Sequence, residues 1–232
     1  MRLGDSAELR KRSTRDFAYI QLKQMIISGR LKPDAPIVED QIATKLSISR
    51  TPLREALQRL EMEELIIRQH NGRLKVSPIS IIEVKEIFTV RMKLEEIVIV
   101  EAMERATEDD YNHLANILLL IRETVKQNNI EDALYYGGQF HQYIYELSEH
   151  KLASNLLSQL NDRIYRYRRL MPMKQFDSFK KSIEEHELIL AYMKEKNKEK
   201  AIRVIQDHLN NSLQAIIQVI NNKTNNGGLT NE

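Results

Sequence analysis

Residues 49–57 of the chain read SRTPLREAL, in which hydroxyl and arginine side chains run directly into leucines. Ser49 is a natural helix N-cap, and Pro52 falls in the first turn, where its missing N–H costs nothing. The sequence therefore predicts that a helix begins at Ser49. The helix dipole already places positive charge at that end, so a helix built only for packing would avoid arginines there. We infer that this helix meets a polyanion end-on.

The two sides of the predicted helix differ in character. Arg50 and Arg54 are four residues apart and share a face, which Gln58 continues. The opposite side carries leucines that would point into a core: Leu53, Leu57 and Leu60. Such a helix can enter a DNA major groove N-terminus first, so that the arginines reach phosphates or guanine edges. The hydroxyls of Ser49 and Thr51, with the free N–H groups of the first turn, can hold a phosphate.

The segments on either side complete a small domain. A helix is predicted over residues 16–28, and a second over residues 38–46 follows a link that contains two prolines. After the quoted helix, the apolar runs 65–69 and 74–77 flank HNGR, which predicts a hairpin whose turn uses Asn71-Gly72. Three helices followed by a hairpin are typical of a winged helix-turn-helix.

The tip of the predicted hairpin supplies further candidates for DNA contact. His70, Gly72 and Arg73 could approach the DNA backbone or the minor groove. The alternative interpretation of the whole region is a solvated basic helix on an ordinary core. The two helices before it and the hairpin after it favour a DNA reader.

Composition limits where the protein works. The chain has 232 residues, enough for two modest domains with separate cores. It contains no cysteine, which excludes disulfides and thiolate metal sites and fits a reducing compartment. The first 17 residues lack the apolar run of a secretion signal, and no stretch reaches the length of a membrane span. These features predict a cytoplasmic protein.

The net charge of +2 is unevenly distributed. Residues 1–78 hold 15 Lys and Arg against 10 Asp and Glu, whereas residues 79–232 hold 20 against 23. A basic first part and a mildly acidic remainder suggest that the first part binds nucleic acid and the second does something else.

The chain divides into four predicted parts. They are a mobile basic arm at 1–15, the winged helix-turn-helix at 16–78, an all-helical domain at 79–221 and a disordered, asparagine-rich tail at 222–232. Six helices are expected in the helical domain: 80–105, 107–128, 130–149, 152–171, 176–196 and 198–221. The predicted fold is mainly α, a winged helix-turn-helix followed by an antiparallel bundle of six to seven helices.

Four stretches of the first domain carry a family likeness: GRLKP (29–33), DQIATKL (40–46), SISRTPLREALQRLEMEELI (47–66) and NGRLKV (71–76). They resemble the DNA-binding domain of the GntR superfamily of bacterial transcription regulators. The resemblance implies that Arg50, Thr51 and Arg54 contact the operator and that Gly72 forms the wing tip. The chain departs from the family at Asp34, where glycine is usual, and at Asp40, where some members carry an arginine that contacts DNA.

Three histidines of the helical domain lie on apolar helix faces. His141, His186 and His208 belong to three different predicted helices, and each has apolar residues three or four positions away. A buried histidine needs partners for its ring nitrogens, and three that converge would form a cage for zinc or a similar divalent ion. Taken singly, each is more typical of a hydrogen-bonded core histidine.

Three stretches surround these histidines: QFHQYIYEL (139–147), EEHELILAYM (184–193) and QDHLNN (206–211). They resemble the FCD domain of FadR-like GntR regulators, and the resemblance covers residues 80–218. It implies a metal site of three histidines and one aspartate, with His141, His186 and His208 as ligands. The aspartate position, one turn before the first histidine, is Gly137 here. The site would then use three imidazoles with water or an effector oxygen, or it would hold no metal.

Arginines supply the remaining candidates. Arg91 matches an arginine that in FCD domains faces the cavity and pairs with an acidic effector, for which a guanidinium fork is well suited. The alternative is a surface arginine paired with Glu95, four residues on. The run RIYRYRRL (163–170) is interpreted as a solvated face with tyrosines turned inward. The alternative places this run beside the effector pocket or DNA.

Together these features predict a DNA-binding transcriptional regulator that acts as a cytoplasmic homodimer. Its helical domain would sense a small organic acid, with a divalent metal at the histidines, and two symmetric readers would contact a short palindrome. One alternative is a metal-dependent enzyme, but Glu185 and Glu187 are expected to turn away from His186, so no general base is evident. The other alternative is a dimeric regulator without a small-molecule effector.

Overall fold

The chain divides into two compact units, Met1–Ile79 and Ser80–Glu232. A computed structural model describes residues 13–170 and 176–225. Within these ranges the fold is mainly α, with a small sheet in the first unit and a helical bundle in the second, which confirms the predicted fold class. No helix in the described part of the chain is both long and apolar enough to cross a membrane.

The first unit begins with α2 (Thr14–Ile27), whose N-cap is Ser13. The Ser13 hydroxyl accepts a hydrogen bond from the backbone N–H of Asp16 at 3.2 Å. The expectation of a mobile arm up to residue 15 is therefore wrong for Thr14 and Arg15, because this cap starts the helix before the predicted boundary. Residues 1–12 of the expected arm lie outside the described residues.

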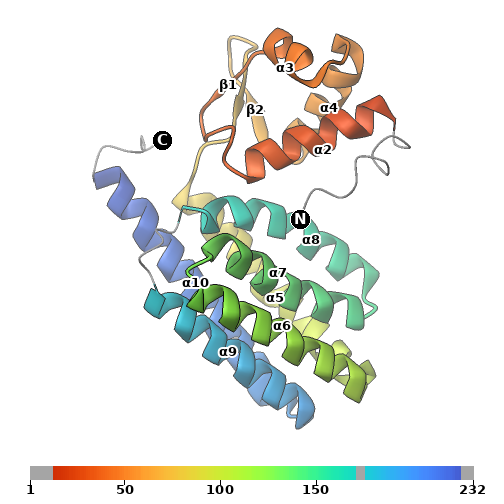
Figure 1. The fold of residues 1–232 in the computed structure, drawn as a ribbon, viewed down its shortest axis with the longest axis vertical. Helices are drawn as coiled ribbons and strands as arrows, with labels where there is room; N and C mark the ends of the chain where they lie inside the picture. The colour runs from red at the N-terminus through yellow and green to blue at the C-terminus, as the bar shows by residue number, and fades with distance from the viewer. Residues whose placement is uncertain (1–12, 171–175, 226–232) are drawn as a thin grey trace. The chain divides into compact units, whose positions relative to one another are not determined.

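Two further helices, α3 (Glu39–Leu46) and α4 (Arg50–Met62), pack with α2 around one core (Figure 1). The helix α4 begins directly after Ser49, as predicted, and buries one side: Leu53, Ala56, Leu57 and Leu60. These side chains join the buried residues of α2 and of the sheet, among them Leu22, Ile26, Ile66 and Val76. Because the leucine side of α4 faces this core, the opposite side of the helix is left to solvent.

The hairpin of the first unit is present with the predicted turn. Its strands are β2 (Ile66–Arg68) and β3 (Leu74–Val76), which pair antiparallel with Ile67 opposite Lys75. Gly72 has φ +78°, a conformation that side-chain-bearing residues rarely adopt, so glycine suits this turn. A strand that was not predicted, β1 (Pro36–Ile37), pairs with the other edge of β3. Two residues are too few to show the alternation that marks a strand.

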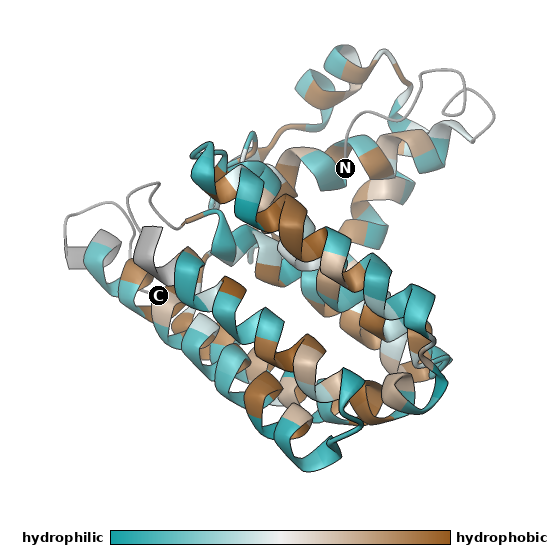
Figure 2. Ribbon diagram, turned by 60° about the horizontal axis from the view of Figure 1, so that its bottom comes forward, coloured by the Kyte–Doolittle hydropathy of each residue, from teal (hydrophilic) through white to brown (hydrophobic). Residues whose placement is uncertain are grey.

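The second unit is a bundle of long helices: α5 (Ile81–Arg105), α6 (Glu108–Lys126), α7 (Ile130–Leu147), α8 (Lys151–Arg168), α9 (Phe176–Lys194) and α10 (Lys198–Asn225). Brown apolar and teal polar bands alternate along the helices in Figure 2, as expected of helices that bury one side. The helix α5 packs against α7, α8, α9 and α10, so it has the most neighbours and the most strongly buried side chains.

The last helix is longer than predicted. A disordered tail was expected from residue 222, but α10 continues to Asn225. Val219 and Ile220 are buried and fix the turn before it, and adding a further turn to an existing helix costs much less than starting one. The rest of the expected tail, residues 226–232, lies outside the described residues.

Candidate functional sites: a DNA-reading helix and a histidine cluster

The first turn of α4 presents the residues that the sequence selected for DNA contact. Arg50, Thr51 and Arg54 are exposed, whereas Leu53, Leu57 and Leu60 of the same helix are buried. Ser49 occupies the N-cap position, but its side chain makes no capping hydrogen bond. Its hydroxyl therefore stays available to an incoming phosphate, alongside the free N–H groups of the turn.

Both arginines are held by acids of the neighbouring helix. Arg50 Nη2 lies 2.8 Å from Asp40 Oδ1, and Arg54 Nε donates to Glu39 Oε2 at 2.8 Å. The two acids occupy the first turn of α3, where the helix dipole favours negative charge. The sequence indicated only that Asp40 replaces an arginine that contacts DNA in some family members. The structure shows that Asp40 also forms an ion pair with Arg50.

The wing tip carries the remaining DNA candidates. His70, Gly72 and Arg73 are all exposed there. Arg68 braces this turn, since it donates to the Gly72 carbonyl at 3.1 Å and to Glu61 of α4 at 2.8 Å. The wing is thereby tied to the same helix that carries Arg50 and Arg54.

The three histidines converge inside the bundle. His141 of α7, His186 of α9 and His208 of α10 are each at most 3% exposed. The Nε2 atom of His141 lies 3.2 Å from Nε2 of His208 and 3.2 Å from Nε2 of His186. One ligand atom from each ring lies within 4.8 Å of the other two, an arrangement that could hold a metal ion. Sequence periodicity had placed each ring on an inward face but could not show that they meet.

Two carboxylates fix the orientation of the rings. His141 Nδ1 lies 2.9 Å from Glu95 Oε2, and His208 Nδ1 lies 2.8 Å from Glu185 Oε2. A carboxylate accepts the Nδ1–H, which leaves the lone pair of Nε2 directed at the centre of the cluster. The expectation that Glu185 turns away from the site is wrong, because α10 packs against α9 and brings His208 to it. Glu187 does point elsewhere and pairs with Arg122.

The charge state of the cluster follows from its surroundings. Burial lowers the pKa of His186 and His208 well below the usual range, and the neighbouring histidines lower each further. Burial also lowers the pKa of His141 despite the adjacent Glu95. Neutral imidazoles at neutral pH are the form that binds a metal. The Nδ1 atom of His186 is buried and has no hydrogen-bond partner among the described residues.

Arg91 lies behind the cluster rather than on the surface. It is fully buried, so the interpretation as a surface arginine is wrong, although the expected pair with Glu95 is present at 2.6 Å. Tyr145 also donates to Glu95, at 2.5 Å. Burial raises the pKa of Glu95, but Arg91 and His141 outweigh it and hold that pKa well below the usual range. Arg91 thus keeps Glu95 ionised to orient His141, and its contact with an effector stays a prediction.

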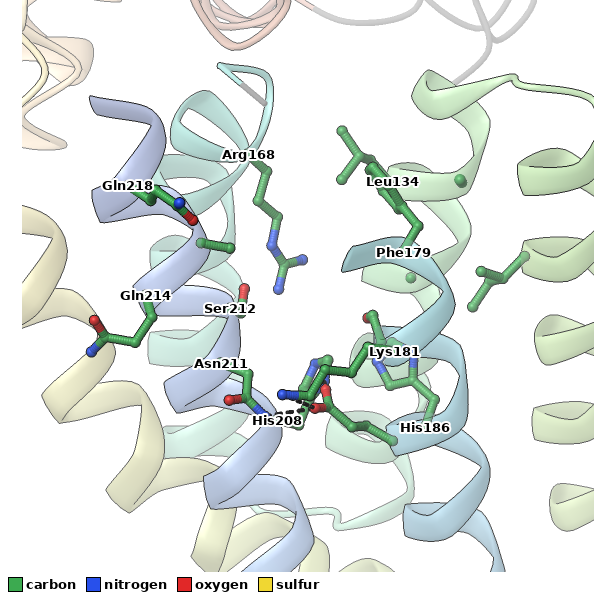
Figure 3. A pocket seen from close by; sticks show the side chains of 16 residues that line it. Leu134, Arg168, Phe179, Lys181, His186, His208, Asn211, Ser212, Gln214 and Gln218 are labelled. Carbon is green, nitrogen blue, oxygen red and sulfur yellow. Dashed lines mark hydrogen bonds and ion pairs between the residues drawn. The ribbon is translucent and has the colours of Figure 1, made fainter. Parts of the chain in front are cut away.

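A cavity of about 440 Å³ opens beside the cluster (Figure 3). His186, His208 and Gly137 form part of its wall, and Arg91 is not among its lining residues. Arg168 of α8 extends into the cavity from the end opposite the histidines (Figure 3). A Cβ atom on Gly137 would meet nothing within 4 Å, so the place of the expected aspartate is open space.

The run 163–170 is not a solvated face. Every residue in it is buried or half-buried, because α8 packs against both α5 and α7. Arg163 binds Glu83 of α5 at 2.6 Å, and Tyr167 is fully buried. Arg168 lines the cavity, and the alternative interpretation, a run beside the effector pocket or DNA, stays a prediction. Arginines at 163, 166, 168 and 169 make the run look polar, and such a pattern does not reveal that helices cover both of its sides.

Comparisons with known proteins match a family model to each of the two units. Residues 14–76 match the model of the bacterial regulatory proteins of the gntR family, and residues 86–211 match that of the FCD domain. The chain is a GntR-family regulator with an FCD domain. This GntR regulator is 29% identical over 206 residues to YdhC, an HTH-type transcriptional regulator of Bacillus subtilis, which covers 87% of the chain and 90% of YdhC.

Other relatives of this GntR regulator include the gluconate operon transcriptional repressor of Bacillus subtilis, at 25% identity over 87% of the chain and 84% of the repressor. Among solved structures, Escherichia coli McbR superposes with a TM-score of 0.77 at 23% identity, covering 89% of the chain and 98% of McbR. A putative GntR regulator from Rhodococcus gives 0.76 at 20% identity. At these identities the structures establish the shared fold.

Proposed function

We propose that this GntR regulator senses a small organic acid through a divalent metal ion held by His141, His186 and His208. The family assigns transcriptional regulation by DNA binding, and the relatives are regulators rather than enzymes. The metal would orient an acidic oxygen of the effector as a Lewis acid does. Ligand binding would then alter DNA affinity only as far as it favours one pose of the readers over another.

The observation that carries the proposal is the approach of three Nε2 atoms. With Nδ1–H of His141 and of His208 donated to carboxylates, their Nε2 lone pairs face each other at 3.2 Å. Two lone pairs at that distance repel each other unless a cation or a proton lies between them, and the lowered pKa values disfavour the proton. Tetrahedral zinc holds ligand nitrogens about 3.3 Å apart, which is close to the 3.2 Å between Nε2 of His141 and Nε2 of each of the other two histidines.

The three histidines would fill three of the four positions of a tetrahedral ion and leave one coordination position open. The described residues bring three imidazoles together and add no carboxylate as a fourth ligand. Glu95 and Glu185 support the ligands through Nδ1, as is usual around metal-bound histidines. Gly137 leaves room at the place where the family has its aspartate. An effector oxygen could fill that position.

We further propose that the regulator is a homodimer that pairs through α5 and α8 and acts in the cytoplasm, where its DNA lies. These two helices pack together and carry large exposed apolar side chains: Ile82, Val90, Ile97, Leu152 and Leu156. A second copy would cover them, and two readers related by a two-fold axis would match a palindromic operator.

Metal content tests the central claim. Protein purified without an affinity tag should contain one divalent ion per chain, and a chelator should lower its melting temperature because the ion stabilises only the folded state. His208→Ala should lose the ion, whereas His113→Ala, which alters an exposed histidine of α6, should keep it. Sub-stoichiometric metal together with unchanged melting in chelator would leave the three histidines as core polar residues.

Effector sensing needs its own measurement. Operator fragments selected from genomic DNA should bind with an affinity that changes when carboxylates or sugar acids are added to metal-loaded protein. Sugar acids belong in this screen because relatives repress gluconate operons. If no acid changes either the melting temperature or the operator affinity, the bundle serves only to dimerise the readers.

A further inference from the structure

Arg168 is a charged residue of the cavity wall that forms no ion pair with a described residue. Its guanidinium extends into the cavity, and it makes no hydrogen bond or ion pair with any described residue (Figure 3). Burial and the charge of Arg91 lower the pKa of Arg168 to about 10. The guanidinium is half-buried and attracted by Glu95, but no carboxylate forms an ion pair or hydrogen bond with it among the described residues. Arginine is the side chain best suited to hold a carboxylate through two parallel bonds.

The other charged groups on the cavity wall already have partners. Glu185 accepts from His208 at 2.8 Å and from Asn211 at 2.7 Å. Lys181 lies 4.0 Å from the same carboxylate. Among the described lining residues, Arg168 is therefore the cation that has no carboxylate within ion-pair distance, and it lies at the end opposite the histidines.

We propose that the cavity recognises a dicarboxylate, with one carboxylate toward the three histidines and the second on Arg168. This inference rests on the proposed metal-dependent sensing. A monocarboxylate at the histidine end would leave Arg168 unpaired inside the cavity. A dicarboxylate would supply one carboxylate for the metal at the histidines and one for Arg168. The open space at Gly137 leaves room for the first carboxylate, at the place where the family has an aspartate side chain. Arg168 is therefore the residue that selects for the second acidic group.

The test uses the full-length protein loaded with zinc and a matched series of acids. The probes are acetate and butyrate as monocarboxylates, and the linear dicarboxylates from malonate to adipate. Apparent affinities come from thermal shifts. At least one dicarboxylate should bind roughly tenfold tighter than either monocarboxylate, the factor expected of one additional charge-assisted pair. Equal binding of the two classes, or no response to any dicarboxylate, overturns the proposal.

Two variants assign the preference to Arg168. Arg168→Gln should remove the advantage of dicarboxylates while the zinc content stays at the wild-type level. Arg169→Gln is the matched control, since Arg169 neighbours it in sequence but binds Glu131 at 2.9 Å and does not line the cavity. A dicarboxylate preference that survives in Arg168→Gln, or that is lost equally in Arg169→Gln, contradicts the assignment.

Gly137→Asp provides an independent readout of the other end. The new carboxylate would occupy the open space beside the histidines and compete with the ligand. In cobalt-loaded protein, dicarboxylates should perturb the visible absorption of the wild type and perturb that of Gly137→Asp much less. Equal perturbation in both proteins would place the acid away from Gly137. Failure of the wild type to bind cobalt or zinc at all instead refutes the proposed metal site, so the two failures are distinguishable.

Discussion

Asp40 shows how one residue can set the behaviour of a DNA reader. Its carboxylate holds Arg50 at 2.8 Å, and the arginine must leave it, or share it, to reach DNA. Both side chains are more than 60% exposed, so the pair is screened by water and contributes little to stability. The carboxylate of Asp40 should matter more for DNA binding, because a negative charge beside α4 repels the phosphates of DNA.

We predict that Asp40→Asn raises the affinity for random duplex DNA by roughly two- to five-fold, the range that corresponds to a surface ion pair. Asp109→Asn, which removes the same charge from the exposed first turn of α6, should leave this affinity unchanged. Fluorescence anisotropy at several salt concentrations measures both. Identical behaviour of the two variants would show that only net charge matters.

Arg50→Ala and Arg54→Ala should each weaken specific operator binding by about 1–3 kcal/mol if the arginines read bases. Both side chains are exposed on α4, so their removal should not disturb folding, and a loss of affinity would reflect a lost DNA contact. Circular dichroism of each variant checks that point. Bandshift affinities equal to the wild type for both variants would remove these arginines from the interface.

Gly138 offers a prediction about stability. It lies within α7, and a Cβ atom there would meet nothing within 4 Å. Gly138→Ala should therefore raise the free energy of unfolding by about 0.5–1 kcal/mol, because alanine loses less backbone entropy in a helix. Chemical denaturation measures the change. A destabilised variant would mean that α7 needs its flexibility at this position.

Among the elements, α5 and α8 carry exposed apolar side chains that no described residue covers. If they form the dimer interface, Val90→Glu and Ile97→Glu should produce monomers in light scattering, because the charges would be buried against a second copy. Leu188→Glu on α9 is the control, since Leu188 is similarly exposed at 46% but lies on another helix. Monomers from the control alone would move the interface to α9.

Helices were largely predictable from the sequence, whereas their contacts were not. The start of α4 followed from Ser49 and Pro52, and the inward faces of the histidines followed from helical spacing. The contact of Glu185 with His208 and the position of Arg168 on the cavity wall were not predicted, because both depend on which helices pack together. Arg91 was similar: its partner Tyr145 comes from a helix more than fifty residues away, so its burial left no local signal. Sequence periodicity gives the direction of a side chain but not what it meets.

At the scale of the whole molecule, the two units must communicate for an acid to change transcription. Linkage requires that an acid which lowers operator affinity by some factor has its own affinity lowered by operator DNA by the same factor. Titrating the acid with and without operator measures this directly. Acid binding that is indifferent to operator, alongside operator binding that responds to acid, would indicate an artefact such as metal removal by the acid.

The cluster of three histidines offers nitrogen ligands alone, and the chain has no cysteine. Peroxide converts thiolate ligands to sulfenic acids and disulfides, and a zinc site built on thiolates then loses its ion. Imidazole does not enter that series of reactions. If a metal ion at this cluster takes part in sensing, the response would persist during oxidative stress, under which thiolate-based zinc sites lose their ion.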